Sequence, residues 1–200
     1  MAKLRENSPT LLGDATPFAI RAEHARDAVA REALLDACFG TDREQRTCQR
    51  LRDGRAPAEG LSFSAVSRRR LIGTVRLWHV NAGGVPALVL GPLAVDPSCR
   101  GSGVGTALVR QAVVAARARG FGAVILLGDA PYYSRFGFSA DKTAELTLPG
   151  RFERHRLLAL ELRKGALDGA WGMIVPTGKP APRVKPRATA RAGKLAPQAA

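Results

Sequence analysis

The hydrophobic and polar residues of this chain alternate between patterns typical of strands and patterns typical of helices. Residues 17–21 form a short apolar run, which predicts a first strand. Residues 23–39 have helical spacing, and Gly40 follows them where a glycine commonly ends a helix. The apolar face of this predicted helix consists of Ala25, Ala28, Val29, Leu35 and Cys38. Residues 42–51 read as a second, polar helix that an Asp-Gly pair closes.

The middle of the chain predicts antiparallel strands joined by turns. Residues 61–67 and 71–80 read as a hairpin with arginines between its strands. A glycine-containing turn then leads into residues 87–95, a nearly unbroken apolar run typical of a central, buried strand. Gly91 and Pro92 interrupt that run. Because a proline has no N–H to donate to a neighbouring strand, we expect the strand to bulge or to part from its neighbour there.

The rest of the body predicts a β-α-β unit and one further strand. Residues 103–119 have the pattern of a helix, and residues 123–127 that of a buried strand. A short helix over residues 131–136 and a last strand over residues 157–162 follow. The order of elements is therefore mixed α/β, with antiparallel strands first and a β-α-β unit after them.

The charge of the chain is less ordinary than its size. Its 200 residues suffice for one well-packed domain, and a hydrophobic content of 46% is typical of globular proteins. Its 31 Lys and Arg residues against 17 Asp and Glu residues give a formal net charge of +14. Such a charge favours an anionic ligand, a nucleic acid or an anionic surface as the partner, without choosing among them.

Part of that charge lies in the last segment, residues 176–200. This segment contains six basic residues, no acidic residue and five of the 13 prolines of the chain, so it contributes +6 and leaves +8 for the rest. Only Val184 and Leu195 are large and apolar in it. Because so little apolar surface cannot offset the entropy lost on ordering, we predict a disordered basic tail rich in proline and alanine.

Cysteine and histidine do not gather into a pattern of their own. Cys38, Cys48 and Cys99 are an odd number and far apart, without a Cys-x-x-Cys pair, and the three histidines are scattered. This spacing argues against a zinc framework and a disulfide scaffold. No span approaches the roughly 20 apolar residues of a membrane helix, and residues 1–9 lead into no signal-peptide core. We therefore expect a reduced, cytoplasmic protein that uses no metal.

The most informative stretch follows the buried strand over residues 87–95. Residues 100–106, with the sequence Arg-Gly-Ser-Gly-Val-Gly-Thr, lead directly into a helix. Glycines let successive backbone amides approach one anion, and the first amides of a helix have no intrahelical partner. With the positive end of the helix dipole they predict a phosphate-binding loop, to which Arg100 adds a charge and Thr106 a hydroxyl. A glycine-rich helix start without a ligand is the alternative interpretation.

Two other phosphate-binding motifs do not fit this loop. A Walker loop needs Gly-Lys followed by Ser or Thr, which the chain lacks. A dinucleotide fingerprint, Gly-x-Gly-x-x-Gly, would end at Thr106 if it began at Gly101, and at Leu108 if it began at Gly103. Neither final position is a glycine, so both motifs are excluded.

The spacing that the loop does match is Arg-x-x-Gly-x-Gly, formed by Arg100, Gly103 and Gly105 after a Leu-Ala-Val-Asp-Pro strand end. A second segment, residues 132–138 with the sequence Tyr-Tyr-Ser-Arg-Phe-Gly-Phe, is close to a Tyr-x-x-x-Gly-Phe signature. With both motifs in this order, the chain resembles the GCN5-related N-acetyltransferases (GNAT), in particular their small bacterial predicted-acetyltransferase branch. The resemblance covers about residues 18–162.

The resemblance implies the α/β fold of acyl-CoA N-acyltransferases, in which helices flank a mixed, mostly antiparallel sheet. Two parallel central strands splay in that fold, and acetyl-CoA lies in the gap between them. The acetyltransferase domain would span residues 17–175, after an N-terminal extension over residues 1–16 and before the tail over residues 176–200. The implied backbone contacts of the pantetheine arm are Leu93, Ala94 and Val95. The implied pyrophosphate loop consists of Arg100, Gly101, Ser102, Gly103, Val104, Gly105 and Thr106.

For catalysis the resemblance implies Tyr133. This residue aligns with the tyrosine that relatives place near the thioester sulfur, where its phenol could protonate the departing CoA thiolate. Packing within a short helix is the alternative role for Tyr133 and for the adjacent Tyr132. The asparagine that precedes this tyrosine in relatives is not evident, because Leu-Leu-Gly-Asp occupies residues 126–129.

A general base is harder to find. Many relatives carry a glutamate on the central strand or use an ordered water, and residues 87–91 contain no acid. Asp129 and Glu59 read more simply as loop carboxylates, and His79 as a residue of the sheet surface. We therefore favour direct attack on the thioester, with water relaying the proton of the amine.

The predicted activity is transfer of an acetyl group from acetyl-CoA to a primary amine of a small molecule or a protein, by direct attack in a ternary complex. The alternatives are a non-catalytic acetyl-CoA sensor or scaffold module, and nucleic-acid binding through the basic tail. Basic residues within residues 23–60 either hold a carboxylated amine or form a solvated helix face. Residues 171–175 are a short apolar segment that either closes over the domain or forms a dimer contact. We expect a monomer or homodimer that contacts no membrane, and nucleic acid at most non-specifically.

Overall fold

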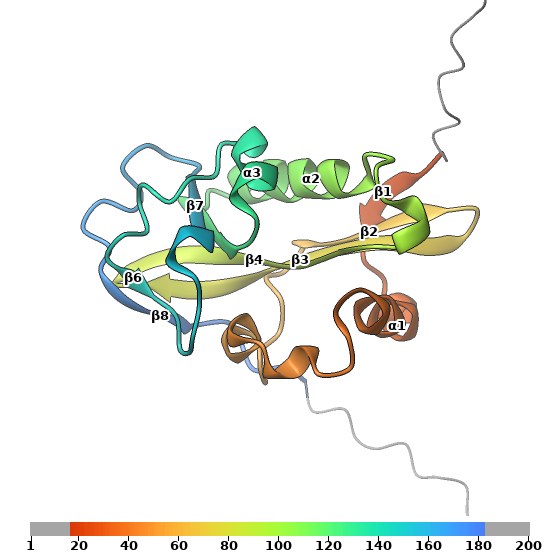
Figure 1. Ribbon diagram of the computed structural model, residues 1–200, viewed down its shortest axis with the longest axis horizontal. Helices are drawn as coiled ribbons and strands as arrows, with labels where there is room; N and C mark the ends of the chain where they lie inside the picture. Colours follow the sequence, from red (N-terminus) through yellow and green to blue (C-terminus); the bar gives the residue numbers. More distant parts are fainter. Residues whose placement is uncertain (1–16, 183–200) are drawn as a thin grey trace, which may run out of the picture.

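The computed structural model of the protein describes residues 17–182, at whose centre lies a mixed sheet. The strands of this sheet are β1 (Ala19–Ala22), β2 (Ser62–Ser67), β3 (Arg70–Ala82), β4 (Val85–Val95), β5 (Ala123–Leu127), β6 (Leu146–Thr147), β7 (Leu157–Glu161) and β8 (Gly172–Pro176). Its main path runs β1-β2-β3-β4-β5-β7, and each neighbouring pair on this path is antiparallel except β4 and β5, which are parallel (Figure 1). The predicted mixed, mostly antiparallel α/β fold is confirmed.

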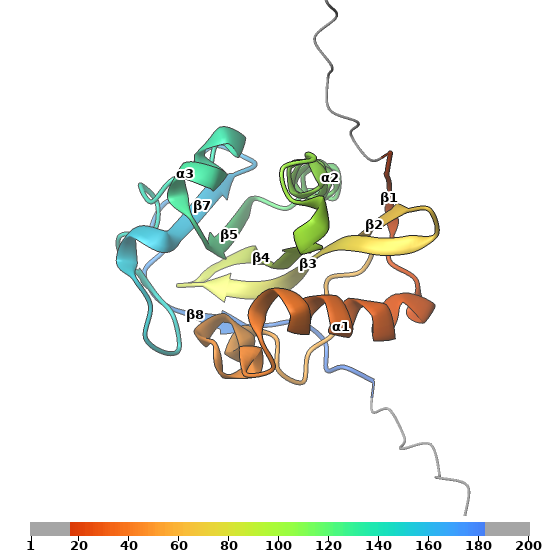
Figure 2. The ribbon, with the colours of Figure 1, turned by 45° about the vertical axis from the view of Figure 1, so that its right-hand side comes forward.

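Helices cover both faces of the sheet. They are α1 (Ala28–Phe39), α2 (Val104–Ala118) and α3 (Ala130–Tyr133), with 3-10 segments η1 (Ala25–Asp27), η2 (Arg43–Gln45), η3 (Thr47–Leu51), η4 (Pro97–Cys99), η5 (Ser134–Phe136) and η6 (Arg154–Arg156). Figure 2 shows α2 on one face of the sheet and α1 on the other. Leu108 and Val109 of α2 are fully buried in the main core, and Leu34 and Leu35 of α1 pack against Ala94 of β4. The β4-α2-β5 order is the predicted β-α-β unit.

Strand β4 departs from both of its neighbours at the predicted interruption. Its pairing with β3 shifts between Val75 and Leu77, so that Gly91 and Pro92 stand opposite the single Arg76. On its other edge β4 pairs with β5 at only two positions, both before Gly91. The interruption is therefore a bulge toward β3 and a parting from β5, which confirms the expected splay of the parallel pair.

The first helical region differs from the predicted one. The predicted helix over residues 23–39 is a 3-10 turn followed by α1, and of its predicted apolar face only Leu35 is fully buried. Val29, predicted on that face, is 83% exposed. The reason is that α1 turns the charged Arg31 toward the sheet, where its guanidinium pairs with Glu23. The prediction counted only apolar residues, and for this reason it assigned the buried face of the helix to the wrong side.

The predicted polar helix over residues 42–51 is wrong. Its residues form the two short segments η2 and η3, because Arg46 between them has extended backbone angles (φ −69°, ψ 144°). The Arg46 guanidinium turns back to the end of α1, where it donates to the Phe39 carbonyl at 3.1 Å and lies 5.2 Å from the centre of the Phe39 ring. The segment therefore follows α1 as a folded loop.

The sheet continues beyond the predicted last strand. Residues 171–175, predicted to be a lid or a dimer contact, contribute most of β8, which pairs with the end of β3 and with β6. Ile174 is fully buried there, whereas Trp171 is 74% exposed. Strands β6 and β8 were missed because each is short and pairs with residues far away in the sequence.

The predicted start of the basic tail at Pro176 is also wrong. The Lys179 carbonyl accepts from the Ala56 amide at 2.8 Å, and the Ala181 amide donates to the Gly54 carbonyl at 2.8 Å. Residues 176–182 therefore belong to the folded part of the chain. The predicted N-terminal extension, residues 1–16, and the rest of the predicted tail, residues 183–200, lie outside the described residues.

Neither a membrane helix nor a metal cluster occurs within residues 17–182. No helix of this part of the chain has the length and apolar character needed to cross a membrane. Three or more His, Cys, Asp or Glu side chains do not come together there to hold a metal ion. The expectations of a cytoplasmic protein and of metal-free chemistry stay predictions.

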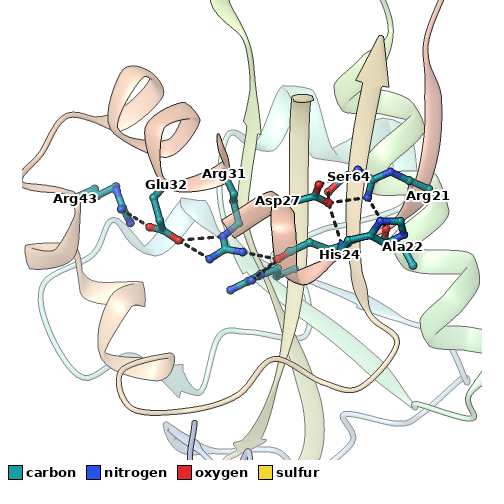
Figure 3. A network of polar contacts seen from close by, with 10 residues as sticks. Arg21, Ala22, His24, Asp27, Arg31, Glu32, Arg43 and Ser64 are labelled. Carbon is teal, nitrogen blue, oxygen red and sulfur yellow. Dashed lines mark hydrogen bonds and ion pairs between the residues drawn. The ribbon is translucent and has the colours of Figure 1, made fainter. Parts of the chain in front are cut away.

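A buried carboxylate joins β1 to β2 and to the turn before α1. The Asp27 carboxylate accepts two hydrogen bonds from Arg21 at 2.6 and 2.8 Å, one from the His24 amide at 2.9 Å and one from the Ser64 hydroxyl at 3.1 Å (Figure 3). The hydrogen bonds from Arg21 hold the pKa of Asp27 well below its ordinary value, with smaller contributions from His24 and Ser64.

A chain of alternating charges continues from the sheet to the loop after α1. Glu23 accepts from the Arg76 Nε at 2.7 Å and also pairs with Arg31. Arg31 lies 2.6 Å from Glu32, which in turn lies 2.6 Å from Arg43 (Figure 3). Each of these arginines therefore has a carboxylate partner, and the chain of contacts fixes α1 against β3.

Asp27→Asn is expected to lower the free energy of unfolding by about 2 kcal/mol at pH 7, because the Arg21 guanidinium loses its counter-ion and Ser64 stays buried. A depressed carboxylate pKa stabilises the fold above the ordinary value of about 3.9, and this contribution disappears as the pH falls through the folded value. Urea denaturation at pH 7 and pH 3 measures both effects. The difference from the wild type should shrink at the lower pH, while Asp168→Asn, at an exposed pair with Lys142, should have little effect. Equal stability of Asp27→Asn and wild type at pH 7 would contradict this account.

Candidate functional site

The loop between β4 and α2 presents a row of backbone amides. Gly101 and Gly103 have φ angles of +80° and +82°, a left-handed conformation that glycine adopts without steric cost. Within residues 17–182, the amides of Gly101 and of residues 103–106 donate to no backbone carbonyl. The first hydrogen bond of α2 runs from the Ala107 amide to the Gly103 carbonyl at 2.9 Å. An anion at this point would receive several N–H groups at the positive end of the helix.

A cavity of about 370 Å³, the first cavity, opens at this loop. The predicted acetyl-CoA contacts that border it are Leu93, Ala94, Val95, Arg100, Gly101, Gly103, Val104, Gly105 and Thr106. The structure therefore brings nine of the ten predicted contacts together. The tenth, Ser102, does not border the cavity, because its hydroxyl donates to the Cys99 carbonyl at 2.5 Å.

Four residues that the sequence did not predict also border the first cavity: Cys38, Phe39, Tyr132 and Arg135. The first two end α1, and their approach to β4 is a tertiary contact without a local signal. The Cys38 thiol lies 3.3 Å from the Val95 carbonyl, to which it donates. Arg135 belongs to the Tyr-x-x-x-Gly-Phe segment that the sequence analysis singled out. Its position in that segment was the one signal in the sequence that could have placed it near the glycine-rich loop.

The two adjacent tyrosines face different cavities. Tyr132 borders the first cavity, with the Arg135 guanidinium 4.7 Å from the centre of its ring. A Cβ atom at Gly105 would lie 2.8 Å from the Tyr132 hydroxyl oxygen, so the absence of a side chain there lets the tyrosine lie against the loop. Burial raises the pKa of Tyr132, and a hydrogen bond with Thr106 opposes that rise.

Tyr133 borders a second cavity, of about 570 Å³. Its ring packs edge-on against Phe138, with ring centres 5.8 Å apart. Burial raises the pKa of the Tyr133 phenol well above its ordinary value, and Tyr132 and Asp129 raise it further. The phenol is therefore protonated at neutral pH, as a proton donor must be.

The second cavity lies where β4 and β5 part. Its apolar and backbone lining consists of Phe39, Leu90, Gly91, Pro92, Leu93, Leu127, Gly128 and Phe152. Phe39 and Leu93 border both cavities. The indole N–H of Trp78 donates to the Gly91 carbonyl at 2.6 Å and so holds the bulge that forms part of this wall. The two cavities thus meet at the bulged end of β4.

The candidate bases differ in their positions. Asp129 borders the second cavity but is exposed, and its carboxylate caps α3 by accepting from the Tyr132 amide at 3.2 Å. Glu59 is exposed and borders neither cavity. The His79 ring lies 5.4 Å from that of Phe121, also away from both cavities. These positions fit the interpretation of Asp129 and Glu59 as loop carboxylates and of His79 as a residue of the sheet surface.

Comparisons with known proteins agree with this geometry. The sequence model of the Acetyltransferase (GNAT) family matches residues 25–138. The chain is 33% identical over 162 residues to YhbS of Escherichia coli strain K12, an uncharacterized N-acetyltransferase, and this match covers 78% of the chain and 93% of YhbS. The crystal structure of E. coli YhbS in complex with CoA has a TM-score of 0.68 at 29% identity, over 86% of this chain and 94% of that one. A GNAT family acetyltransferase of Brucella melitensis in complex with acetyl-CoA has a TM-score of 0.62 at 25% identity, over 81% and 97%.

Proposed function

This chain belongs to the GNAT family and is an acetyl-CoA-dependent N-acetyltransferase, and from this premise we propose that it acetylates a primary amine by direct attack in a ternary complex. The observation that carries the proposal is the meeting of two cavities at the bulged end of β4. One offers a row of free amides, and the other a protonated tyrosine.

The first cavity is the proposed site of acetyl-CoA. Its pyrophosphate would accept hydrogen bonds from the amides of Gly101 and residues 103–106, and Arg100 would add a positive charge. Each charge-assisted hydrogen bond of this kind is worth about 1.5–3 kcal/mol, so several together account for firm binding. The pantetheine arm would follow Leu93, Ala94 and Val95, where the edge of β4 facing β5 has no strand partner among the described residues.

The acetyl transfer itself needs one proton donated and one removed. The amine nitrogen forms a bond to the thioester carbonyl carbon, the C–S bond breaks, and the sulfur leaves as a thiolate. We assign Tyr133 as the acid that protonates this sulfur, and water as the relay that takes the proton of the amine. Cys48 also borders the second cavity, but burial raises the pKa of its thiol. A thiol kept protonated is a poor nucleophile, which favours direct transfer over an acetyl-cysteine route.

CoA release measured with acetyl-CoA and a panel of primary amines tests the proposed transfer, and calorimetry with acetyl-CoA tests the donor site separately. We expect micromolar or tighter binding of acetyl-CoA and amine-dependent release of CoA. Absence of acetyl-CoA binding would overturn the proposal as a whole. Binding without any amine-dependent release would instead identify the non-catalytic sensor or scaffold.

The dependence of kcat on pH should reflect the raised pKa of Tyr133. An acid whose pKa lies above its ordinary value of about 10 stays protonated throughout the working range and loses its proton only as the pH rises through that higher value. We therefore expect kcat to hold level from pH 8 to pH 10, with buffers matched in ionic strength. If kcat falls as the pH rises but already below pH 9, and this fall disappears in Tyr133→Phe, the raised pKa of Tyr133 is contradicted.

A further inference from the structure

The second cavity carries an excess of positive charge. Its charged lining consists of Arg43, Arg46, Arg52, Arg151 and Arg156 against Asp129 and Glu153. Part of this charge is neutralised within the protein. Arg43 pairs with Glu32 and Asp36, at 2.6 and 2.7 Å, and Arg156 lies 3.5 Å from Glu153. The excess therefore concentrates on the remaining arginines.

Arg52 differs from Arg46 and Arg151, which also make no ion pair in the described part of the chain, because it is half-buried and they are exposed. Its side chain is half-buried directly after η3, and its Nε donates to the Cys48 carbonyl at 3.2 Å. Within residues 17–182 it makes no ion pair, although a guanidinium has five N–H groups to donate. Burial lowers the pKa of Arg52, Cys48 and Asp53 oppose that fall, and the charges of Arg43 and Arg76 add to it. A partly desolvated cation among other cations is costly unless an anion joins it.

The other basic residues of this region have structural roles. Arg50 donates to the Pro149 carbonyl at 2.5 Å, and Arg55 to the Gly178 carbonyl at 2.9 Å, and neither borders the second cavity. The basic residues within residues 23–60 were interpreted either as a site for a carboxylated amine or as a solvated helix face. Arg52 does not fit a solvated face, because it is half-buried and borders the second cavity. Arg156 borders the same cavity, and because its contact with Glu153 is long, at 3.5 Å, and exposed, it keeps part of its charge for a ligand there.

We propose that the acceptor is a small amine that also carries an oxyanion, a carboxylate or a phosphate, which Arg52 binds with help from Arg156. This inference rests on the proposed acetyl transfer. Arg52 and Tyr133 border the same cavity, so the oxyanion and the amine of one molecule have separate places in it. A guanidinium matches the two oxygens of a carboxylate or phosphate with two parallel hydrogen bonds. The cavity volume of about 570 Å³ lies in the range of small-molecule sites.

Matched pairs of amines test this inference. We would compare phosphoethanolamine with ethanolamine, γ-aminobutyrate with butylamine, and lysine with cadaverine, measuring kcat and KM for each. The expected result is a kcat/KM at least about 30-fold higher for the oxyanion member of at least one pair, since loss of one partner of a buried charge pair has an effect of this size or greater. The pair that responds distinguishes phosphate from carboxylate.

The variants are Arg52→Met, Arg52→Lys and, as a control of equal charge change, Arg110→Met on the exposed surface of α2. Arg52→Met should remove the preference by raising KM for the anionic amine, with KM for acetyl-CoA unchanged. Arg52→Lys should restore part of it, and Arg110→Met should keep all of it. Thermal denaturation of each variant separates loss of binding from loss of folding.

The outcomes separate this inference from the proposed function. If amines are acetylated without preference for an oxyanion, or if the preference survives Arg52→Met, the inference fails while the transfer stands. If acetyl-CoA binds but no amine is acetylated, the proposed acetyl transfer is refuted. Calorimetric titration of the same anionic amines into the complex of the protein with CoA then tests the oxyanion site separately. Binding there that Arg52→Met abolishes supports the site, and absence of binding overturns it.

Discussion

Tyr133→Phe is expected to lower kcat by about 10²–10⁴-fold, the range over which a positioned general acid contributes. The phenol borders the cavity where the thioester would lie, and it carries its proton at neutral pH. The edge-on packing against Phe138 involves the ring alone, so phenylalanine should preserve the fold. Affinity for acetyl-CoA should change little, because the free amides lie at the other cavity.

Tyr132→Phe is the matched control for this prediction. Its hydroxyl lies against Gly105, in the first turn of α2 at the first cavity, so its loss should leave kcat within a few-fold of the wild type. Steady-state rates with saturating acetyl-CoA, together with calorimetric affinities, measure both variants. The assignment of Tyr133 would be wrong if the two variants lost kcat equally, or if only Tyr132→Phe lost it.

The second large effect is expected for Gly103→Val, which should weaken acetyl-CoA binding by about 100-fold or more. A β-branched residue is strained at the φ angle of +82°, so the loop should shift and turn its amides away from a common point. Loss of two charge-assisted hydrogen bonds, at about 1.5 kcal/mol or more each, corresponds to roughly that factor. Calorimetry with CoA and acetyl-CoA measures the change.

Gly84→Val provides the control for backbone strain. Gly84 also has a left-handed φ angle, +96°, and at neither glycine would a Cβ atom meet another atom within 4 Å. It lies in the turn between β3 and β4, outside both cavities. Both variants should lose similar stability in thermal denaturation, and only Gly103→Val should lose acetyl-CoA affinity. Equal affinities in the two variants would refute the role of the loop.

The features predictable from the sequence are those whose causes are local. Strand β5 has the predicted bounds, because five apolar residues between glycine-containing turns leave few other choices. The break at Gly91 and Pro92 follows from the missing N–H of proline alone. The amide-rich loop follows from the spacing of its glycines, and for this reason nearly all of its predicted residues border one cavity.

The features that escaped prediction depend on contacts between distant residues. Arg31 faces the sheet because Glu23 is there to receive it, which helical periodicity does not reveal. Strand β8 exists because the end of β3 offers it an edge. Arg52 looks like any surface arginine in the sequence, and only its burial without a carboxylate partner in the described part of the chain distinguishes it.

Phe39 and Leu93 line both cavities where these meet, so the occupancy of one cavity is linked to the shape of the other. A ligand that shifts either side chain on entering the first cavity changes the free energy of binding at the second. Thermodynamic linkage then requires the reverse effect to be of the same size, so the factor by which the donor alters affinity for the acceptor equals the factor by which the acceptor alters affinity for the donor. A donor that moves Phe39 or Leu93 on binding would therefore be a heterotropic effector of the acceptor, and the acceptor of the donor.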